Sequence, residues 1–366
     1  MSILIFVIIL LILVLVHEFG HFYSAKKFGI RVDEFGFGFP PKLFGYKWGE
    51  TEYTFNLFPL GGFVKIFGEN PDDENTFGPD KDRSFVNKPK WQQAVVLFAG
   101  VFMNFMLAWV LFSFGFISGL PTSVGSELKG YALTDVNTVV VSVAPHSPAE
   151  NAGLKSGDKI VAIKSATDST TNISPTTIKS MVMANPNKEL EFGYVRGSNK
   201  NEVNTVKITP ISDGGKDPMI GISMDQIGIA KLPILKAFGE GMKLTLYMTK
   251  STVLGLFGLI GKGLVGKGDL SQVTGPVGLV GVVGDAYKFG FSYLLSFAGL
   301  ISVNLAVINL VPFPALDGGR LLFLIIEKIK GSRINAKFLN IANIAGFAIL
   351  ILFMLVITYK DVVKLF

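Results

Sequence analysis

The stretch ILIFVIILLILVLVHEFGHFY, residues 3–23, is an apolar run that ends in two histidines and a glutamate. Residues four apart share one face of a helix, so His17 and His21 can reach one metal ion while Glu18 stands beside them. The chain has only three histidines, and two of them lie where an ionisable group costs about 2.5–3.5 kcal/mol without a partner. The spacing therefore predicts a metal site in or near a membrane. A satisfied pair of helix histidines, or a decayed site, is the alternative.

The composition is that of a membrane protein. Hydrophobic residues make up 49% of the 366 residues, mean hydropathy is +0.47, and the apolar residues gather in runs. We therefore expect a polytopic membrane protein with one soluble insert. The chain has no cysteine, which excludes disulfides and thiolate ligands, so a metal here must be held by imidazole and carboxylate groups.

Four stretches are long and apolar enough to span a bilayer as helices. They cover about 3–23, 95–119, 291–312 and 341–358. A fifth stretch, 234–265, has four charged residues in its first half and many glycines in its second. We predict an interfacial or re-entrant amphipathic helix for this stretch, and four transmembrane helices in total.

Basic residues indicate which loops face the cytoplasm. Five follow the first apolar run and five lie between the last two, and the positive-inside rule places both loops inside. These residues are Lys26, Lys27, Arg31, Lys42, Lys47, Arg320, Lys328, Lys330, Arg333 and Lys337. No basic patch interleaved with aromatic residues suggests nucleic acid as a partner.

The two long polar stretches differ in character. Residues 51–58 alternate polar and apolar residues and run into Pro59-Leu60-Gly61-Gly62, which predicts a small β-hairpin or sheet on the cytoplasmic side. Residues 124–225 are polar with short strand-like runs, enough for one small external domain. We expect an N-terminal membrane part at 1–123, the inserted domain at 124–226 and a C-terminal membrane part at 227–366.

The third metal ligand is predicted from a broken helix. A catalytic zinc site takes three protein ligands, and the remaining histidine, His146, lies in the external domain. Asp317 follows Pro312 and Pro314, which must interrupt the third apolar run, and broken helices at membrane depth are tolerated where they line a cavity. Asp317 is therefore the expected carboxylate ligand. A helix end with an aspartate in an interfacial turn is the alternative.

Two asparagines in or beside the apolar runs are candidate substrate-binding residues. Asn309 precedes the prolines by one turn, and Asn104 lies in the second run after Gly100. An amide can hold a substrate backbone or a developing oxyanion. Either amide could equally form an interhelical hydrogen bond, with Gly100 allowing close packing.

Four motifs together resemble the bacterial site-2 proteases, zinc intramembrane metalloproteases of the RseP type, over nearly the whole length. They are HEFGH at 17–21, WGETEY with PLGGFVK within 48–65, the segment 100–104 and NLVPFPALDGG at 309–319. The resemblance implies one zinc ion bound by His17, His21 and Asp317, with Glu18 as the catalytic acid and base. It also implies the bacterial cytoplasmic membrane as the location, with the active site towards the cytoplasm.

The insert resembles a circularly permuted PDZ domain through the segment 147–160, SPAENAGLKSGDKI. The resemblance to site-2 proteases implies substrates that span the membrane, such as anti-sigma factors or signal-peptide remnants. The resemblance to a PDZ domain implies a C-terminal peptide as its ligand. The strand around Gly61 and Gly62 could add an unwound substrate as a further strand. The alternative function is an inactive membrane scaffold that presents the PDZ-like domain and keeps a structural metal.

Overall fold

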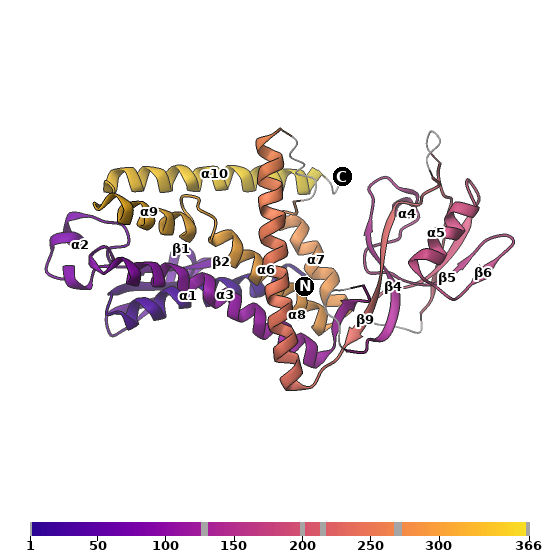
Figure 1. Cartoon of the computed structure of the whole chain (residues 1–366), viewed down its shortest axis with the longest axis horizontal. Helices are drawn as coiled ribbons and strands as arrows, with labels where there is room; N and C mark the ends of the chain where they lie inside the picture. Colours follow the sequence, from indigo (N-terminus) through magenta and orange to yellow (C-terminus); the bar gives the residue numbers. More distant parts are fainter. Residues whose placement is uncertain (1, 126–130, 198–201, 213–216, 267–272, 364–366) are drawn as a thin grey trace. The chain divides into compact units, whose positions relative to one another are not determined.

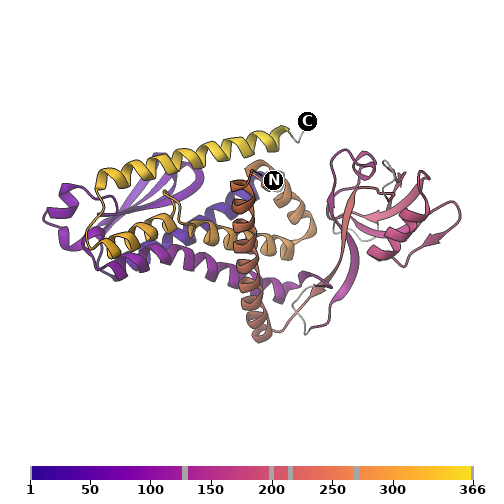
Figure 2. The same cartoon turned by 45° about the horizontal axis from the view of Figure 1, so that its top comes forward.

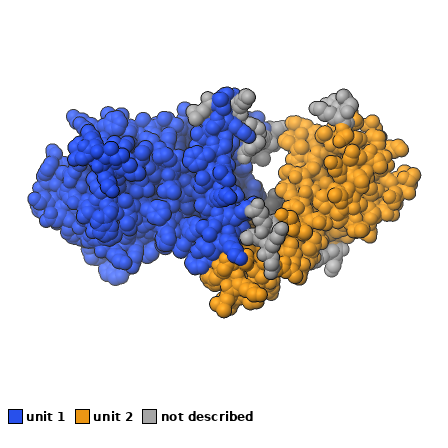
Figure 3. All heavy atoms as spheres, viewed as in Figure 1, with its two compact units in different colours: residues 1–112, 241–284, 297–366 blue, residues 113–240, 285–296 orange. Residues whose placement is uncertain are grey.

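The computed structural model describes residues 2–125, 131–197, 202–212, 217–266 and 273–363. The chain divides into two compact units, coloured separately in Figure 3. Unit 1 contains residues 1–112, 241–284 and 297–366, and unit 2 contains residues 113–240 and 285–296.

The four predicted spans are helices, each extending somewhat beyond or short of its apolar run. They are α1 (Ser2–Lys27), α3 (Lys90–Ser118), α8 (Phe291–Asn309) and α10 (Ala336–Val363). Helix α8 ends three residues before Pro312. This is expected because proline cannot continue a helix and restricts the residue before it.

The prediction of four spans is wrong, because α6 (Ile234–Leu264) is a fifth helix that is long and apolar enough to cross a membrane. Its 31 residues rise about 46 Å, more than the hydrocarbon thickness of about 30 Å, so the charged residues of its first half need not lie in the apolar core. In Figures 1 and 2, α6 runs across the direction of α3 and α10. It is a candidate membrane span because of its length and apolar composition, and not because it is aligned with these helices.

The predicted small sheet is present in unit 1, and a preceding stretch that was not predicted as strand supplies half of it. Strands β1 (Val32–Trp48) and β2 (Thr51–Ile66) pair antiparallel along their lengths, with several register shifts. Phe35 lies opposite both Tyr53 and Val64, so the first half of β1 is flanked by both halves of β2. The segments follow the order 42–48, 51–56, 32–37 and 62–66. Among the described residues, no strand pairs with the outer edge of 62–66.

Short elements complete unit 1. Lys26 and Arg83 both hydrogen-bond Glu50, at 2.5 and 2.6 Å, which ties the end of α1 and a later loop to the turn between β1 and β2. The short elements of unit 1 are α2 (Asp73–Phe77), η1 (Lys81–Arg83), η2 (Phe85–Asn87) and α9 (Asp317–Lys330). Helix α7 (Pro276–Phe289) begins in unit 1 and ends in residues of unit 2.

Unit 2 is built on an antiparallel sheet with the strand order β3-β9-β4-β5-β7-β8, and β6 pairs with β5. The strands are β3 (Leu120–Ser123), β4 (Thr134–Val143), β5 (Lys159–Lys164), β6 (Ser169–Thr170), β7 (Leu190–Val195), β8 (Asn204–Ile208) and β9 (Ile222–Ala230). Two helices accompany them, α4 (Pro148–Asn151) and α5 (Pro175–Ala184).

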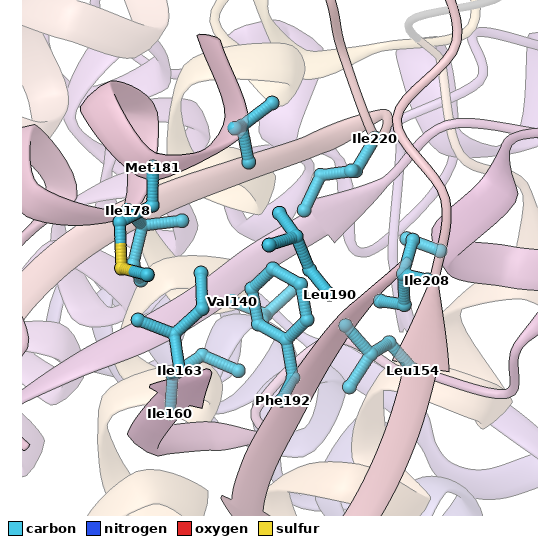
Figure 4. Packing of buried hydrophobic residues seen from close by; sticks show 12 residues of the cluster. Val140, Leu154, Ile160, Ile163, Ile178, Met181, Leu190, Phe192, Ile208 and Ile220 are labelled. Carbon is cyan, nitrogen blue, oxygen red and sulfur yellow. The ribbon is translucent and has the colours of Figure 1, made fainter. Parts of the chain in front are cut away.

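The core of unit 2 forms where α5 packs on the sheet, with Ile178 and Met181 directed towards Phe192 and its neighbours (Figure 4). Beside it, the carboxylate of Asp158 is fully buried and accepts two hydrogen bonds from Arg196, both 2.7 Å long. A buried charge is tolerated when it is paired in this way.

Candidate metal centre and active site

Three side chains of unit 1 converge on one point. The Nε2 atoms of His17 and His21 are 3.2 Å apart, and Asp317 Oδ2 lies 3.1 Å from the first and 3.3 Å from the second. Four ligands about 2.0–2.1 Å from a tetrahedral zinc ion lie about 3.3–3.4 Å from one another. The three atoms therefore have the spacing of one face of such a tetrahedron, and both histidines are buried residues.

The protonation of the cluster also fits a cation. His21 Nδ1 lies 2.8 Å from the main-chain oxygen of Val96, so Nδ1 carries the proton and Nε2 presents a lone pair to the cluster. Asp317 Oδ2 is buried and accepts no hydrogen bond from any described residue. Lone pairs that face one another without a proton between them repel, and a zinc ion removes that repulsion. The residues present thus fit zinc.

Glycines let α1 and α3 approach closely enough to form the cluster. A Cβ atom on Gly20 would lie 2.4 Å from the main-chain oxygen of Ala99. A Cβ on Gly100 would lie 2.3 Å from His21 Nε2 and 2.8 Å from His17 Cε1. Position 100 must therefore be glycine for both imidazoles to occupy their places.

The turn between α8 and α9 delivers Asp317 as the first residue of α9. A Cβ on Gly318 would lie 2.3 Å from the carbonyl oxygen of Leu310, and one on Gly319 would lie 2.1 Å from that of Phe313. The glycine pair after Asp317 thus allows the turn to fold back onto the helix.

Helix α10 supports this turn from the other side. The N–H of Ala315, a residue with φ of 76°, donates to Asn343 Oδ1 at 3.3 Å. A Cβ on Gly346 would lie 2.5 Å from the carbonyl oxygen of Pro314. These two α10 residues were not predicted from the sequence, although an asparagine and a glycine three apart in an apolar run are a recognisable signal.

The remaining predicted residues lie on two sides of the cluster. Glu18 and Asn309 are partly exposed, and Asn309 Nδ2 is 3.4 Å from His17 Nε2. The backbone of Gly62 passes close to Glu18, because a Cβ there would lie 3.8 Å from Glu18 Cγ. Gly61 is one residue further away and packs against the Phe39 ring. Asn104, by contrast, is completely buried, with its Nδ2 3.4 Å from His17 Nδ1.

His146 is not part of the cluster. It is an exposed residue of unit 2, in the turn before α4, and its main-chain N–H donates to Glu150 at 2.5 Å.

Long apolar helices with two HExxH histidines and a carboxylate converging on one point define a multi-pass membrane metalloprotease. The chain belongs to peptidase family M50, whose sequence profile matches residues 5–353. This assignment, together with the His-His-Asp cluster, makes it a zinc metalloprotease of the site-2 type.

Full-length relatives agree with the family. A protein of Clostridium perfringens is 37% identical, covering 96% of this chain and 95% of the relative. The zinc metalloprotease RasP of Geobacillus kaustophilus is 30% identical, covering 100% and 98%. The regulator of sigma-W protease RasP of Bacillus subtilis is 31% identical, covering 99% and 98%.

Proposed function

We propose that this chain cuts peptide bonds within the transmembrane segments of other membrane proteins. The observation that carries the proposal is the position of the His17, His21 and Asp317 cluster. Two of its three ligands lie inside an apolar helix, and a partly exposed glutamate stands beside them. Chemistry at that depth is available to a segment held in the membrane and is closed to a folded soluble protein.

The chain's own groups divide the reaction between them. Zinc, when bound, supplies a Lewis acid that polarises a carbonyl and makes water acidic. Glu18 takes a proton from the attacking water and returns it to the leaving amine. Asn309, beside His17 Nε2, donates its amide N–H to the oxygen of the scissile carbonyl, where negative charge develops.

A transmembrane substrate must unwind before it can be cut, because its carbonyls are held in helical hydrogen bonds. The outer edge of segment 62–66 offers replacement partners, and Gly62 brings this edge next to Glu18. We propose that the unwound substrate adds to this edge as an extra strand, with Gly61 and Gly62 at the point of contact.

The sheet itself would lie against the membrane. Its far end carries large exposed apolar side chains together with two lysines, a composition suited to the interface between lipid tails and headgroups. These apolar residues are Phe39, Leu43, Phe44, Tyr46, Trp48, Leu57 and Phe58, and the lysines are Lys42 and Lys47.

The substrates and the orientation are part of the same proposal. The sigma-W name of the Bacillus subtilis relative suggests membrane-anchored anti-sigma factors, and signal-peptide remnants are a second class. The positive-inside rule, applied to the basic loops, favours an active site towards the cytoplasmic side of a bacterial cytoplasmic membrane. The domain at 124–226 would then be external and PDZ-like, binding a C-terminal peptide, between membrane parts at 1–123 and 227–366.

The test is cleavage of a synthetic transmembrane peptide by the purified full-length chain in lipid vesicles, with the cut located by mass spectrometry. We expect a cut inside the apolar stretch, and we expect Glu18→Gln to lower the rate at least about 1000-fold with zinc content unchanged. Glu189→Gln, which alters an exposed ion pair with Lys207 in unit 2, is the matched control. Wild-type rates from Glu18→Gln would exclude the mechanism.

A further inference from the structure

The two ring nitrogens of His17 face two asparagines in different surroundings. Asn309 lies at Nε2, on the cluster side, and is partly exposed. Asn104 lies at Nδ1, on the far side, with 0% of its surface exposed. A substrate can reach the first amide, whereas the second is sealed within the helices of unit 1.

Helix α3 contacts both histidines at the same ring nitrogen, Nδ1. His21 Nδ1 is bonded to the main-chain oxygen of Val96, and His17 Nδ1 faces the side chain of Asn104. These two residues are eight apart on α3, with Gly100 midway between them making room for both rings. One face of α3 thus meets the non-ligating nitrogen of each imidazole.

Hydrogen-bond chemistry decides which atom of Asn104 faces the ring. If His17 Nε2 is to bind zinc, Nδ1 carries the proton and needs an acceptor. Asn104 Oδ1 is buried and has no hydrogen-bond partner among the described residues. Half a turn of the amide exchanges Oδ1 with Nδ2, and the unused acceptor then receives the Nδ1 proton.

The backbone of Asn104 is held in place from α8. The Ser302 hydroxyl donates to the main-chain oxygen of Asn104 at 2.8 Å, and both residues are fully buried. The backbone that carries the Asn104 side chain is therefore held in place. A residue that orients a metal ligand needs such support.

We propose that Asn104 is a positioning residue for the zinc site. Its side-chain oxygen accepts the His17 Nδ1 proton, which fixes the tautomer and the ring orientation that leave Nε2 free for the metal. The inference rests on the zinc site of the proposed function and is independent of the substrate. It assigns Asn104 to metal binding in place of the substrate contact expected from the sequence.

The experiment measures zinc affinity of the full-length chain in detergent by competition with a chromophoric chelator. Asn104→Leu removes the acceptor at similar size, and Asn104→Asp keeps an acceptor oxygen. Asn304→Leu is the matched control, because the side-chain oxygen of Asn304, on α8, accepts a hydrogen bond from Thr252 at 3.0 Å.

We expect Asn104→Leu to weaken zinc binding about 10–100-fold, and Asn104→Asp and Asn304→Leu to stay close to wild type. A cobalt-loaded Asn104→Leu chain should also show a changed visible absorption spectrum, because its His17 ligand is no longer oriented. The proposal is overturned if folded Asn104→Leu binds zinc like wild type, including the case in which only its turnover falls, as a substrate contact requires. It is also overturned if Asn104→Asp or Asn304→Leu loses zinc as strongly as Asn104→Leu. Failure of the chain to cut a peptide would leave these affinities interpretable.

Discussion

The His17, His21 and Asp317 cluster has two faces built on different principles. The sealed face consists of Val96, Gly100 and Asn104 on α3, three buried residues that lie against the imidazoles. The open face consists of Glu18 and Asn309, whose side chains are partly exposed, and of the edge at Gly62, with which no further strand pairs among the described residues. We infer that separate sets of residues bind the metal and contact the substrate. Substitutions on the sealed face should change zinc affinity, and substitutions on the open face should change turnover.

The largest effect is expected from Gly100→Ala on the sealed face. The new methyl group would overlap both imidazoles, so the two rings cannot keep their positions. We expect zinc affinity to fall more than about 100-fold and cleavage to disappear, measured by metal content and by peptide cleavage. Gly255→Ala on α6 is the control, because a Cβ there meets nothing within 4 Å among the described residues. A Gly100→Ala chain with full zinc would show that close packing of α3 against the imidazoles is not required for metal binding.

The next effect is expected from Asn309→Ala on the open face. Loss of one donor to a developing oxyanion costs about 100–1000-fold in kcat, and zinc content should stay at the wild-type level because no ligand is disturbed. Steady-state cleavage kinetics and metal analysis on the same preparation check this. If the zinc is lost together with activity, Asn309 belongs to the metal site and the two faces are not separate.

A smaller effect should follow from Asn343→Ala, which touches neither face directly. This change removes the hydrogen bond to the N–H of Ala315, two residues before Asp317. A hydrogen bond of this kind is worth about 1 kcal/mol net, so we expect zinc to bind about fivefold more weakly. Competition with a chelator measures it, and an unchanged affinity would show that α10 does not position the Asp317 turn.

The smallest effect is expected at Glu50, outside both faces. Burial alone would raise the pKa of Glu50, but the hydrogen bonds and charges of Lys26 and Arg83 outweigh it and hold the pKa below its ordinary value. A lowered pKa stabilises the folded state above the unfolded value of about 4.3, and this contribution is lost as the pH falls through the folded value.

Glu50→Gln should therefore lower the unfolding temperature slightly at pH 7, by the equivalent of no more than about 1 kcal/mol. The difference from wild type should shrink as the pH is lowered towards 4, while zinc content and turnover at pH 7 stay unchanged. Thermal unfolding of the two chains across this pH range is the measurement. A difference that grows in acid would contradict the assigned sign.

Residue chemistry explains which parts of this site could be predicted. The HExxH spacing and the prolines before Asp317 are local signals, and the structure brings these three side chains together. The partner of His21 could not be predicted, because it is the main-chain oxygen of Val96. Every residue has such a carbonyl oxygen, so the sequence does not single out this one. The burial that separates Asn104 from Asn309 depends on how α3 and α8 pack, which neither sequence window contains.

The fold shows the same division between local and distant information. Four apolar runs gave four helices at nearly the expected places, because uninterrupted apolar length is decisive. For α6, the charges in its first half favour an interfacial or re-entrant helix, but the helix is long enough to be a candidate span despite them. The first half of the sheet was missed because residues 32–48 include Pro40 and Pro41 and several glycines, and their pairing depends on β2.

The zinc K-edge X-ray absorption spectrum of the purified full-length chain, compared with that of Asp317→Ala, shows directly whether His17, His21 and Asp317 hold the metal. We expect one zinc ion per chain, with scattering from two imidazoles and from oxygen ligands at about 2.0–2.2 Å, and loss of that zinc when Asp317 is replaced. Zinc without imidazole scattering, or an Asp317→Ala chain that keeps its zinc and its spectrum, would exclude a zinc site formed by these three residues.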